Sequence, residues 1–144
     1  MKNAQLALFL GLGTLFWLNA ALVIRFGGPT VFSTGSPWLL LCYGLAIPLT
    51  LVSLYLTKLI SGLRYAELLR PVVVMTFTAT FLDAMALTRF QSLYSESFEV
   101  ALHGAAWILW GVGLGLLFSY YLEQKSGGGY LISLAFLLLE VCWL

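Results

Sequence analysis

Charged residues are scarce in this chain. Only 9% of its 144 residues are Asp, Glu, Lys or Arg, whereas 61% are hydrophobic and the mean hydropathy is +0.97. Soluble domains average about 25% charged and about 45–50% apolar residues. This deficit excludes an ordinary soluble domain, a disordered chain and a coiled coil. The formal net charge of +1 also leaves no basic surface for nucleic acid.

Reactive and metal-binding residues are few as well. The two cysteines, Cys42 and Cys142, lie far apart with no Cys-x-x-Cys pattern, and His103 is the single histidine. We therefore interpret both thiols as free and predict no metal site. The sequence contains no phosphate-binding loop, serine nucleophile elbow or paired catalytic carboxylates. These absences favour a protein that is not an enzyme and needs no cofactor.

The charges that are present separate long apolar runs. A helix needs about 20 residues to cross a hydrocarbon core of about 30 Å. The first run is longer than the roughly 7–15 apolar residues of a signal peptide, so we expect a retained helix. The sequence thus predicts an all-α, four-helix transmembrane domain over residues 1–125, with helices at about residues 4–24, 37–57, 71–88 and 98–122.

Glycine and proline mark the connections between these helices. Gly27-Gly28-Pro29 predicts the start of a loop, and Pro37 suits the first turn of the second helix. Pro48 is expected to kink that helix because it removes a backbone hydrogen bond. Residues 58–70 predict a loop or short surface helix. Residues 126–144 predict a glycine-rich hinge and an interfacial or partly inserted C-terminal helix, with a fifth full span as the alternative and Glu140 unexplained.

The basic residues predict an orientation. Lys and Arg in short loops favour the cytoplasmic side, and five of the seven fall on the side of the N-terminus. We expect both termini in the cytoplasm and a location in the bacterial cytoplasmic (inner) membrane, with the lipid bilayer as the surrounding partner. The five are Lys2, Lys58, Arg64, Arg70 and Lys125.

Most polar residues within the spans fall in the opposite half. Asn19 and Asp83 each lie six residues before an arginine, which at 1.5 Å per residue puts both about 9 Å below the helix ends. His103 enters from the same side. We therefore predict a polar site of Asn19, Asp83 and His103 capped by Arg25 and Arg89, with Arg25 or His103 as the partner of Asp83.

The third helix favours an inward-facing Asp83. Thr76, Thr80 and Asp83 follow i, i+4, i+7 spacing and form one polar stripe. An intramembrane acid faces the bundle or a wet cavity, so Asp83 is either a proton or cation site or a structural hydrogen-bonding group. The threonine hydroxyls also have the alternative of bonding to their own helix backbone.

The fourth helix carries two stripes. Gly104, Gly111 and Gly115 predict close helix packing, either within the bundle or in a homo-oligomer, because small residues let membrane helices approach. His103, Trp107 and Trp110 form the second stripe. The two tryptophans either line a cation or quinone pocket or anchor packing.

Three segments carry a resemblance to a known family. Residues 17–27 (WLNAALVIRFG), 81–87 (FLDAMAL) and 104–117 (GAAWILWGVGLGLL) resemble a family of short bacterial four-helix membrane proteins of undefined function. The resemblance implies the four-helix fold and transfers no catalytic residue. Small multidrug exporters share the size, but they depend on a first-helix glutamate, which this chain lacks.

Two functions follow as expectations. The leading one is a structural or accessory membrane protein that assembles through glycine-rich helix faces with itself or a larger membrane complex. The alternative is a small proton-coupled transporter or channel that uses Asp83. A third hypothesis is a quinone- or lipid-handling enzyme that uses His103, Trp107 and Trp110.

Overall fold

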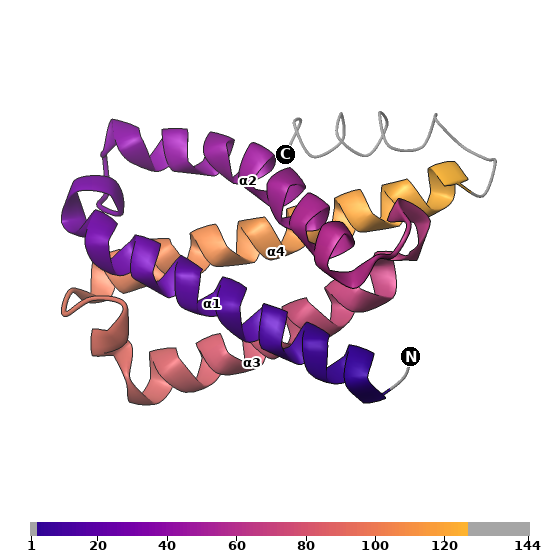
Figure 1. The fold of residues 1–144 in the computed structure, drawn as a ribbon. Coiled ribbons are helices and arrows are strands. Elements are labelled where there is room, and N and C mark those ends of the chain that lie inside the picture. The colour runs from indigo at the N-terminus through magenta and orange to yellow at the C-terminus, as the bar shows by residue number, and fades with distance from the viewer. Residues whose placement is uncertain (1–2, 127–144) are drawn as a thin grey trace.

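The computed structural model describes residues 3–126, which form four long helices and two short 3-10 turns (Figure 1). Each long helix is long and apolar enough to cross a membrane, so the predicted all-α, multi-pass fold is confirmed. The helix expected at residues 130–144, with Glu140 and Cys142, lies outside the described residues. The elements are α1 (Asn3–Val31), α2 (Pro37–Ser61), η1 (Tyr65–Glu67), α3 (Leu69–Arg89), η2 (Gln91–Leu93) and α4 (Phe98–Ser126).

The first helix does not end near residue 24 as expected. α1 continues through the Gly-Gly-Pro sequence to Val31, with a kink at Gly28, where φ is 50° and ψ is −152°. Only glycine adopts such a backbone conformation without strain. Pro29 then fits the turn that follows, because a helix start does not need its missing N–H. The connection to α2 is therefore shorter than the sequence predicted.

The second helix begins at Pro37 as predicted and remains one helix across Pro48. It ends at a left-handed Gly62 (φ 67°), whose N–H bonds to the Lys58 carbonyl oxygen at 2.9 Å, a glycine-dependent helix stop. The short surface helix anticipated in residues 58–70 is the single turn η1.

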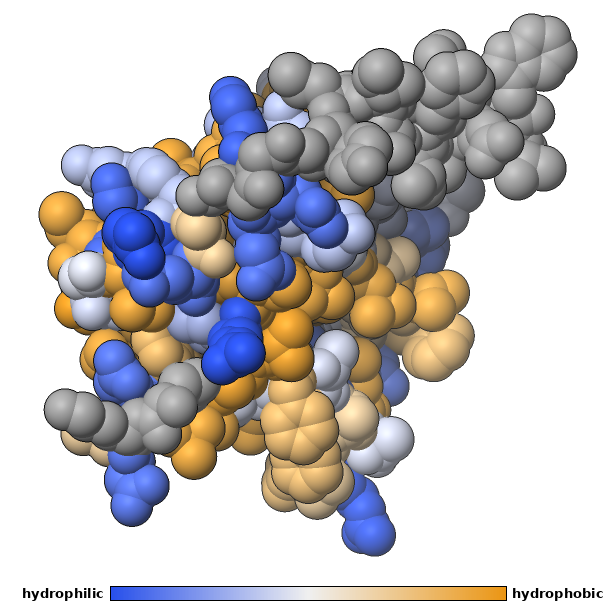
Figure 2. Space-filling model, turned by 90° about the vertical axis from the view of Figure 1, so that its right-hand side faces the viewer, coloured by the Kyte–Doolittle hydropathy of each residue, from blue (hydrophilic) through white to orange (hydrophobic). Residues whose placement is uncertain are grey.

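The helices pack most extensively as α1 with α3 and α2 with α4. We call the end with the α1–α2 and α3–α4 connections the Arg25 end, at the left of Figure 1, and the end with the α2–α3 connection the Arg64 end. Figure 2 looks onto the Arg64 end and shows hydrophilic side chains gathered among apolar ones.

The buried apolar residues divide between the two ends. The larger cluster joins α1, α3, α4 and both connections at the Arg25 end, and the partly buried Leu39 of α2 packs against it. Two smaller clusters lie towards the Arg64 end, around Met75 and around Val72. The larger cluster comprises Ala21, Ile24, Phe32, Ala86, Tyr94, Val100, Ala101 and Ile108.

Candidate functional site

Asp83 is buried on α3 and is bonded by two side chains from other segments. The Trp17 indole N–H, from α1, donates to Asp83 Oδ1 at 2.9 Å, and the Tyr94 hydroxyl donates to the same oxygen. The indole nitrogen also lies 2.9 Å from the Tyr94 oxygen. Three segments therefore meet at one carboxylate oxygen, and we call this set Trp17, Asp83 and Tyr94 the Asp83 triad.

Tyr94 reaches Asp83 because the α3–α4 connection folds back over the bundle. After η2, its ring is fully buried in the larger apolar cluster. Burial and the hydrogen bond to Asp83 raise the pKa of Tyr94 above its usual range. The hydroxyl therefore keeps its proton and acts as a donor.

The basic residues predicted near Asp83 lie elsewhere. Arg25 is exposed, and its Nη1 donates to the backbone carbonyl oxygens of Ser92 at 2.6 Å and Leu93 at 3.4 Å. Arg89 is also exposed and makes no side-chain hydrogen bond or ion pair within residues 3–126. Neither arginine supplies a counter-charge to Asp83.

His103 belongs to a second polar contact at the same end. Its Nε2 lies 3.3 Å from the Thr34 hydroxyl and 4.0 Å from Glu99 Oε1. The Thr34 backbone N–H donates to that same Glu99 oxygen at 2.6 Å. This contact joins the α1–α2 connection to the start of α4, so His103 is not brought to Asp83.

Asn19 is the remaining member of the predicted site. It is exposed on α1 and, in the part of the chain described, its side chain has no hydrogen bond. Sequence reasoning treated Asn19 as a polar neighbour of Asp83 and missed Trp17, two residues earlier. The available signal was the spacing Gly13, Trp17, Ala21, which places Trp17 on a helix face with small residues.

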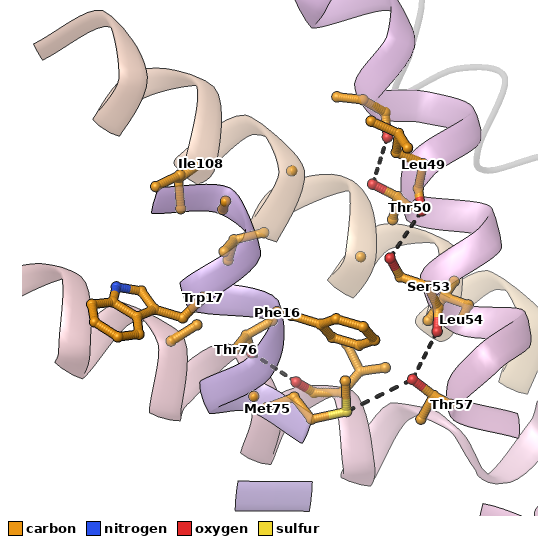
Figure 3. A pocket seen from close by; sticks show the side chains of 18 of the residues that line it. Phe16, Trp17, Leu49, Thr50, Ser53, Leu54, Thr57, Met75, Thr76 and Ile108 are labelled. Atoms are coloured by element: carbon orange, nitrogen blue, oxygen red, sulfur yellow. Dashed lines mark hydrogen bonds between the residues drawn. The ribbon is translucent and has the colours of Figure 1, made fainter. Parts of the chain in front are cut away.

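A cavity of about 200 Å³ lies between the four helices, and Asp83 is part of its wall. We call it the central cavity. Apolar side chains from all four helices make up most of the lining, including Phe16, Met75 and Ile108 (Figure 3). Asp83 is the sole ionisable side chain among the lining residues, which are drawn from the described part of the chain.

The hydroxyl groups around the cavity already donate their protons within their own helices. Thr50, Ser53 and Thr57 donate to carbonyl oxygens one turn earlier on α2, as the dashed lines in Figure 3 show. Thr76 likewise donates to the Val72 carbonyl oxygen at 2.9 Å, and Thr80 to that of Thr76. The alternative of bonding to their own helix is therefore confirmed for both threonines of the α3 stripe.

Asp83 differs from these hydroxyls. Both of its hydrogen bonds fall on Oδ1, and Oδ2 accepts none from the residues that the structure describes. Within the described residues, every fully buried side-chain oxygen or nitrogen has a hydrogen-bond partner. Because Oδ2 has none, it is not fully buried and retains some accessible surface. Asp83, a residue of the cavity wall, thus has one carboxylate oxygen that accepts no hydrogen bond from the described residues.

The glycines of α4 have different surroundings. Gly104 is buried against Ile24, whose side-chain atoms would lie 2.6–2.8 Å from an added Cβ. Gly111 and Gly115 instead line the central cavity. A Cβ at Gly111 would meet nothing within 4 Å, and one at Gly115 would meet the nearest atom at 3.8 Å.

The two α4 tryptophans bind α2. Trp107 Nε1 donates to the Cys42 carbonyl oxygen at 2.9 Å, and Trp110 Nε1 to that of Tyr43 at 3.2 Å. Both acceptors lie in the turns of α2 just before Pro48. Because proline has no backbone N–H, this part of α2 also lacks one helical hydrogen bond. The Cys42 thiol is free and half-buried. Trp107 also lines the central cavity, while Trp110 does not.

Fold and site together define a multi-pass helical membrane protein with one carboxylate at a cavity inside the bundle. Comparisons with protein-family models, curated proteins and solved structures find no match to this chain. The resemblance to short bacterial four-helix proteins therefore stays a prediction.

Proposed function

We propose that this protein is a small proton-coupled transporter in which Asp83 alternately holds a proton and a solute. The observation that carries the proposal is the position of Asp83 in the wall of the central cavity, with no basic side chain in contact with it in the described residues. A charged group within a membrane span marks an ion or substrate path by default. A permanent arginine partner would have favoured a purely structural role.

The surroundings of Asp83 support exchange at one oxygen. Tyr94 and Trp17 hold Oδ1 in place, so the carboxylate is oriented while Oδ2 stays free. Tyr94 is the titratable group that faces Asp83. Arg25 is engaged by backbone carbonyl oxygens and His103 by Thr34 and Glu99. Protonation at Oδ2 would therefore change the charge of the cavity without breaking the triad.

Location and orientation belong to the same proposal. The side chains of Lys58, Arg64 and Arg70 lie at the Arg64 end, and Arg25 and Arg89 at the other. The excess of basic residues supports placing the Arg64 end in the cytoplasm of a bacterial inner membrane. Maleimide labelling of Arg64→Cys and Glu96→Cys variants in intact cells tests this orientation. An impermeant maleimide reacts only with a cysteine on the non-cytoplasmic side of the membrane.

The transport proposal can be tested in liposomes that hold a pH-sensitive dye and an acidic interior. Adding Na⁺, K⁺ or a small quaternary ammonium ion outside should raise the internal pH faster with the protein than without it. We expect Asp83→Asn to lower the rate to that of protein-free liposomes. The matched control is Glu96→Gln, the same carboxyl-to-amide change on an exposed linker residue, which should behave as the wild type.

Two outcomes would contradict the proposal. Wild-type protein that never exceeds the protein-free rate with any of these ions argues against coupled transport. An Asp83→Asn variant that transports normally per folded molecule argues that Asp83 serves only to hold the helices together.

The accessory role remains a second candidate because of the outer face of α1. Asn19 is exposed there without a hydrogen bond in the described residues, and a Cβ at Gly11, two turns away, would meet nothing within 4 Å. An amide both donates and accepts, so Asn19 of a second copy is a complementary partner. Gly111 and Gly115, by contrast, are turned to the cavity.

Cross-linking tests this assembly. Cysteine at position 19 should give a disulfide-linked dimer in the membrane, whereas cysteine at position 16, on the cavity side of α1, should not. Equal cross-linking at both positions, or none at position 19, would argue against self-association through this face.

A further inference from the structure

The central cavity has the size of a small ligand with one ring. Its volume of about 200 Å³ is below the roughly 300–1,000 Å³ of pockets for drug-sized molecules. It is somewhat larger than an engineered apolar cavity of about 150 Å³ that takes up benzene. Leu49 both lines the cavity and is 54% exposed, so the cavity meets the outer surface of the bundle beside this turn of α2.

The lining selects against polar ligands. The cavity-facing threonine and serine hydroxyls are bonded to their own helices, and the indole N–H groups of Trp17 and Trp107 are bonded to Asp83 and to the Cys42 carbonyl oxygen. A sugar or an amino acid would lose its hydrogen bonds to water and find few replacements here. The lining instead favours a ligand whose surface is mostly apolar.

One feature of the lining favours positive charge. Asp83 brings a carboxylate with a free Oδ2 and no basic partner within the described residues. Phe16, Trp17 and Trp107 are also among the lining residues, and Figure 3 shows the Phe16 ring extending from α1 towards α2. Aromatic faces attract organic cations, most strongly where water is excluded.

We infer that the central cavity binds a lipophilic monovalent cation, an organic ammonium ion with an apolar body of about one ring. Its charge lies against Asp83 Oδ2 and its body against the apolar walls from the four helices. This inference names the solute class of the transporter proposed above and rests on that function for its physiological meaning, but binding is measurable on its own.

An isosteric pair of probes separates charge from shape. Phenyltrimethylammonium and tert-butylbenzene have nearly the same form, and only the first is charged. Calorimetric titration of the purified protein in detergent micelles, corrected for partition into empty micelles, gives the affinity for each. We expect the cation to bind at least about tenfold more tightly than the neutral probe, which corresponds to ~1.4 kcal/mol. In Asp83→Asn this preference should fall to about one- to threefold.

A second variant keeps the inference testable if Asp83→Asn does not fold. Gly111→Leu adds a side chain to the cavity wall, where a Cβ has open space, and should abolish binding of both probes. Gly113→Leu is the matched control, since it lies on the same helix, also has open space and does not line the cavity. It should bind both probes like the wild type.

The possible results divide cleanly. Equal binding of the two probes by the wild type, or loss of binding in both glycine variants alike, would overturn the inference. If Na⁺ or K⁺ drives Asp83-dependent proton release while phenyltrimethylammonium shows no preference, transport stands and the solute class is wrong. If the cation binds as expected but no ion drives proton release, the site stands and the transport proposal fails.

Discussion

At the Arg25 end, side-chain hydrogen bonds join segments far apart in the chain, whereas at the Arg64 end the helices meet through apolar contacts. The Asp83 triad and the contact of Thr34 with Glu99 both cross between elements. Towards the Arg64 end, Gly13 lies against the Met75 backbone, and Thr57 is the buried hydroxyl beside the Met75 sulfur. The same bundle thus combines directional bonding around its carboxylate with shape-dependent packing away from it.

This difference bears on function. Hydrogen bonds fix the orientation of a group, and a carboxylate that must accept a proton or a cation has to be held in place. Close packing in a membrane instead depends on small residues that let the helix backbones approach. At each end, therefore, different residues should be the ones whose substitution destabilises the protein most.

The largest expected effect is at the Arg64 end, in Gly13→Ala. An added Cβ would lie 2.7 Å from the Met75 carbonyl oxygen and 3.0 Å from its Cα, so backbone rather than a flexible side chain must move. Overpacking of this kind costs about 1–3 kcal/mol. Unfolding in mixed detergent and SDS micelles should detect this loss. Gly11→Ala, where a Cβ meets nothing within 4 Å, should be neutral or slightly stabilising. Equal losses in the two variants would mean that the α1–α3 approach is not close.

The next effect concerns the Asp83 triad. Tyr94→Phe removes the hydroxyl that donates to Asp83 and should destabilise the protein by about 1 kcal/mol, since such bonds in membrane proteins average about 0.6 kcal/mol with a maximum near 1.7. Trp17→Phe should cost a similar amount. The double variant should be less stable than either single one but less affected than their sum, because both donors share Oδ1. Tyr55→Phe, on an exposed ring, is the control, and strict additivity would argue against a shared acceptor.

Arg25 gives a smaller effect at the same end. Its guanidinium donates to the carbonyl oxygens of Ser92 and Leu93 and holds the connection that carries Tyr94. Because the side chain is exposed, we expect Arg25→Gln to cost only about 0.5–1 kcal/mol. Hydrogen exchange of residues 90–97 should become faster. Arg89→Gln, which removes the same charge from a side chain without a partner in the described residues, should leave that exchange unchanged. Faster exchange in both variants would trace the effect to charge alone.

The sequence predicted the helices better than the contacts between them. Apolar length and the charges at the ends were enough for four spans, because each helix satisfies its own backbone in the membrane. The path of α1 past Gly28 was missed because Gly-Gly-Pro usually marks a loop, and here one unusual glycine conformation joins two helical stretches. Phe32, which follows this kink, is fully buried in the larger apolar cluster, a tertiary contact that no local pattern contains.

The candidate site was predicted in part, for a related reason. The i, i+4, i+7 stripe identified the inward face of α3, and depth placed Asp83 near the Arg25 end. Its partners could not be found by looking for opposite charge, since the donors are an indole and a phenol. Tyr94 in particular follows a short 3-10 turn, whose direction is set by packing at the end of the bundle and not by periodicity.

The smallest expected effect lies at the Arg64 end, in the η1 turn. The Arg64 backbone N–H donates to Glu67 Oε2 at 3.0 Å, and the Arg64 guanidinium lies 3.3 Å from Oε1. These bonds hold the pKa of Glu67 below its ordinary value. A lowered pKa in the folded state adds stability above the unfolded value of about 4.3, and that stability is lost as the pH falls through the folded value. Wild type should therefore unfold at a higher temperature than Glu67→Gln at pH 7, and this difference in unfolding temperature should disappear as the pH falls through the lowered folded pKa of Glu67. Because the pair is exposed, the gap should also shrink in high salt. A gap that persists at low pH would assign the contribution of Glu67 to side-chain shape rather than to its charge.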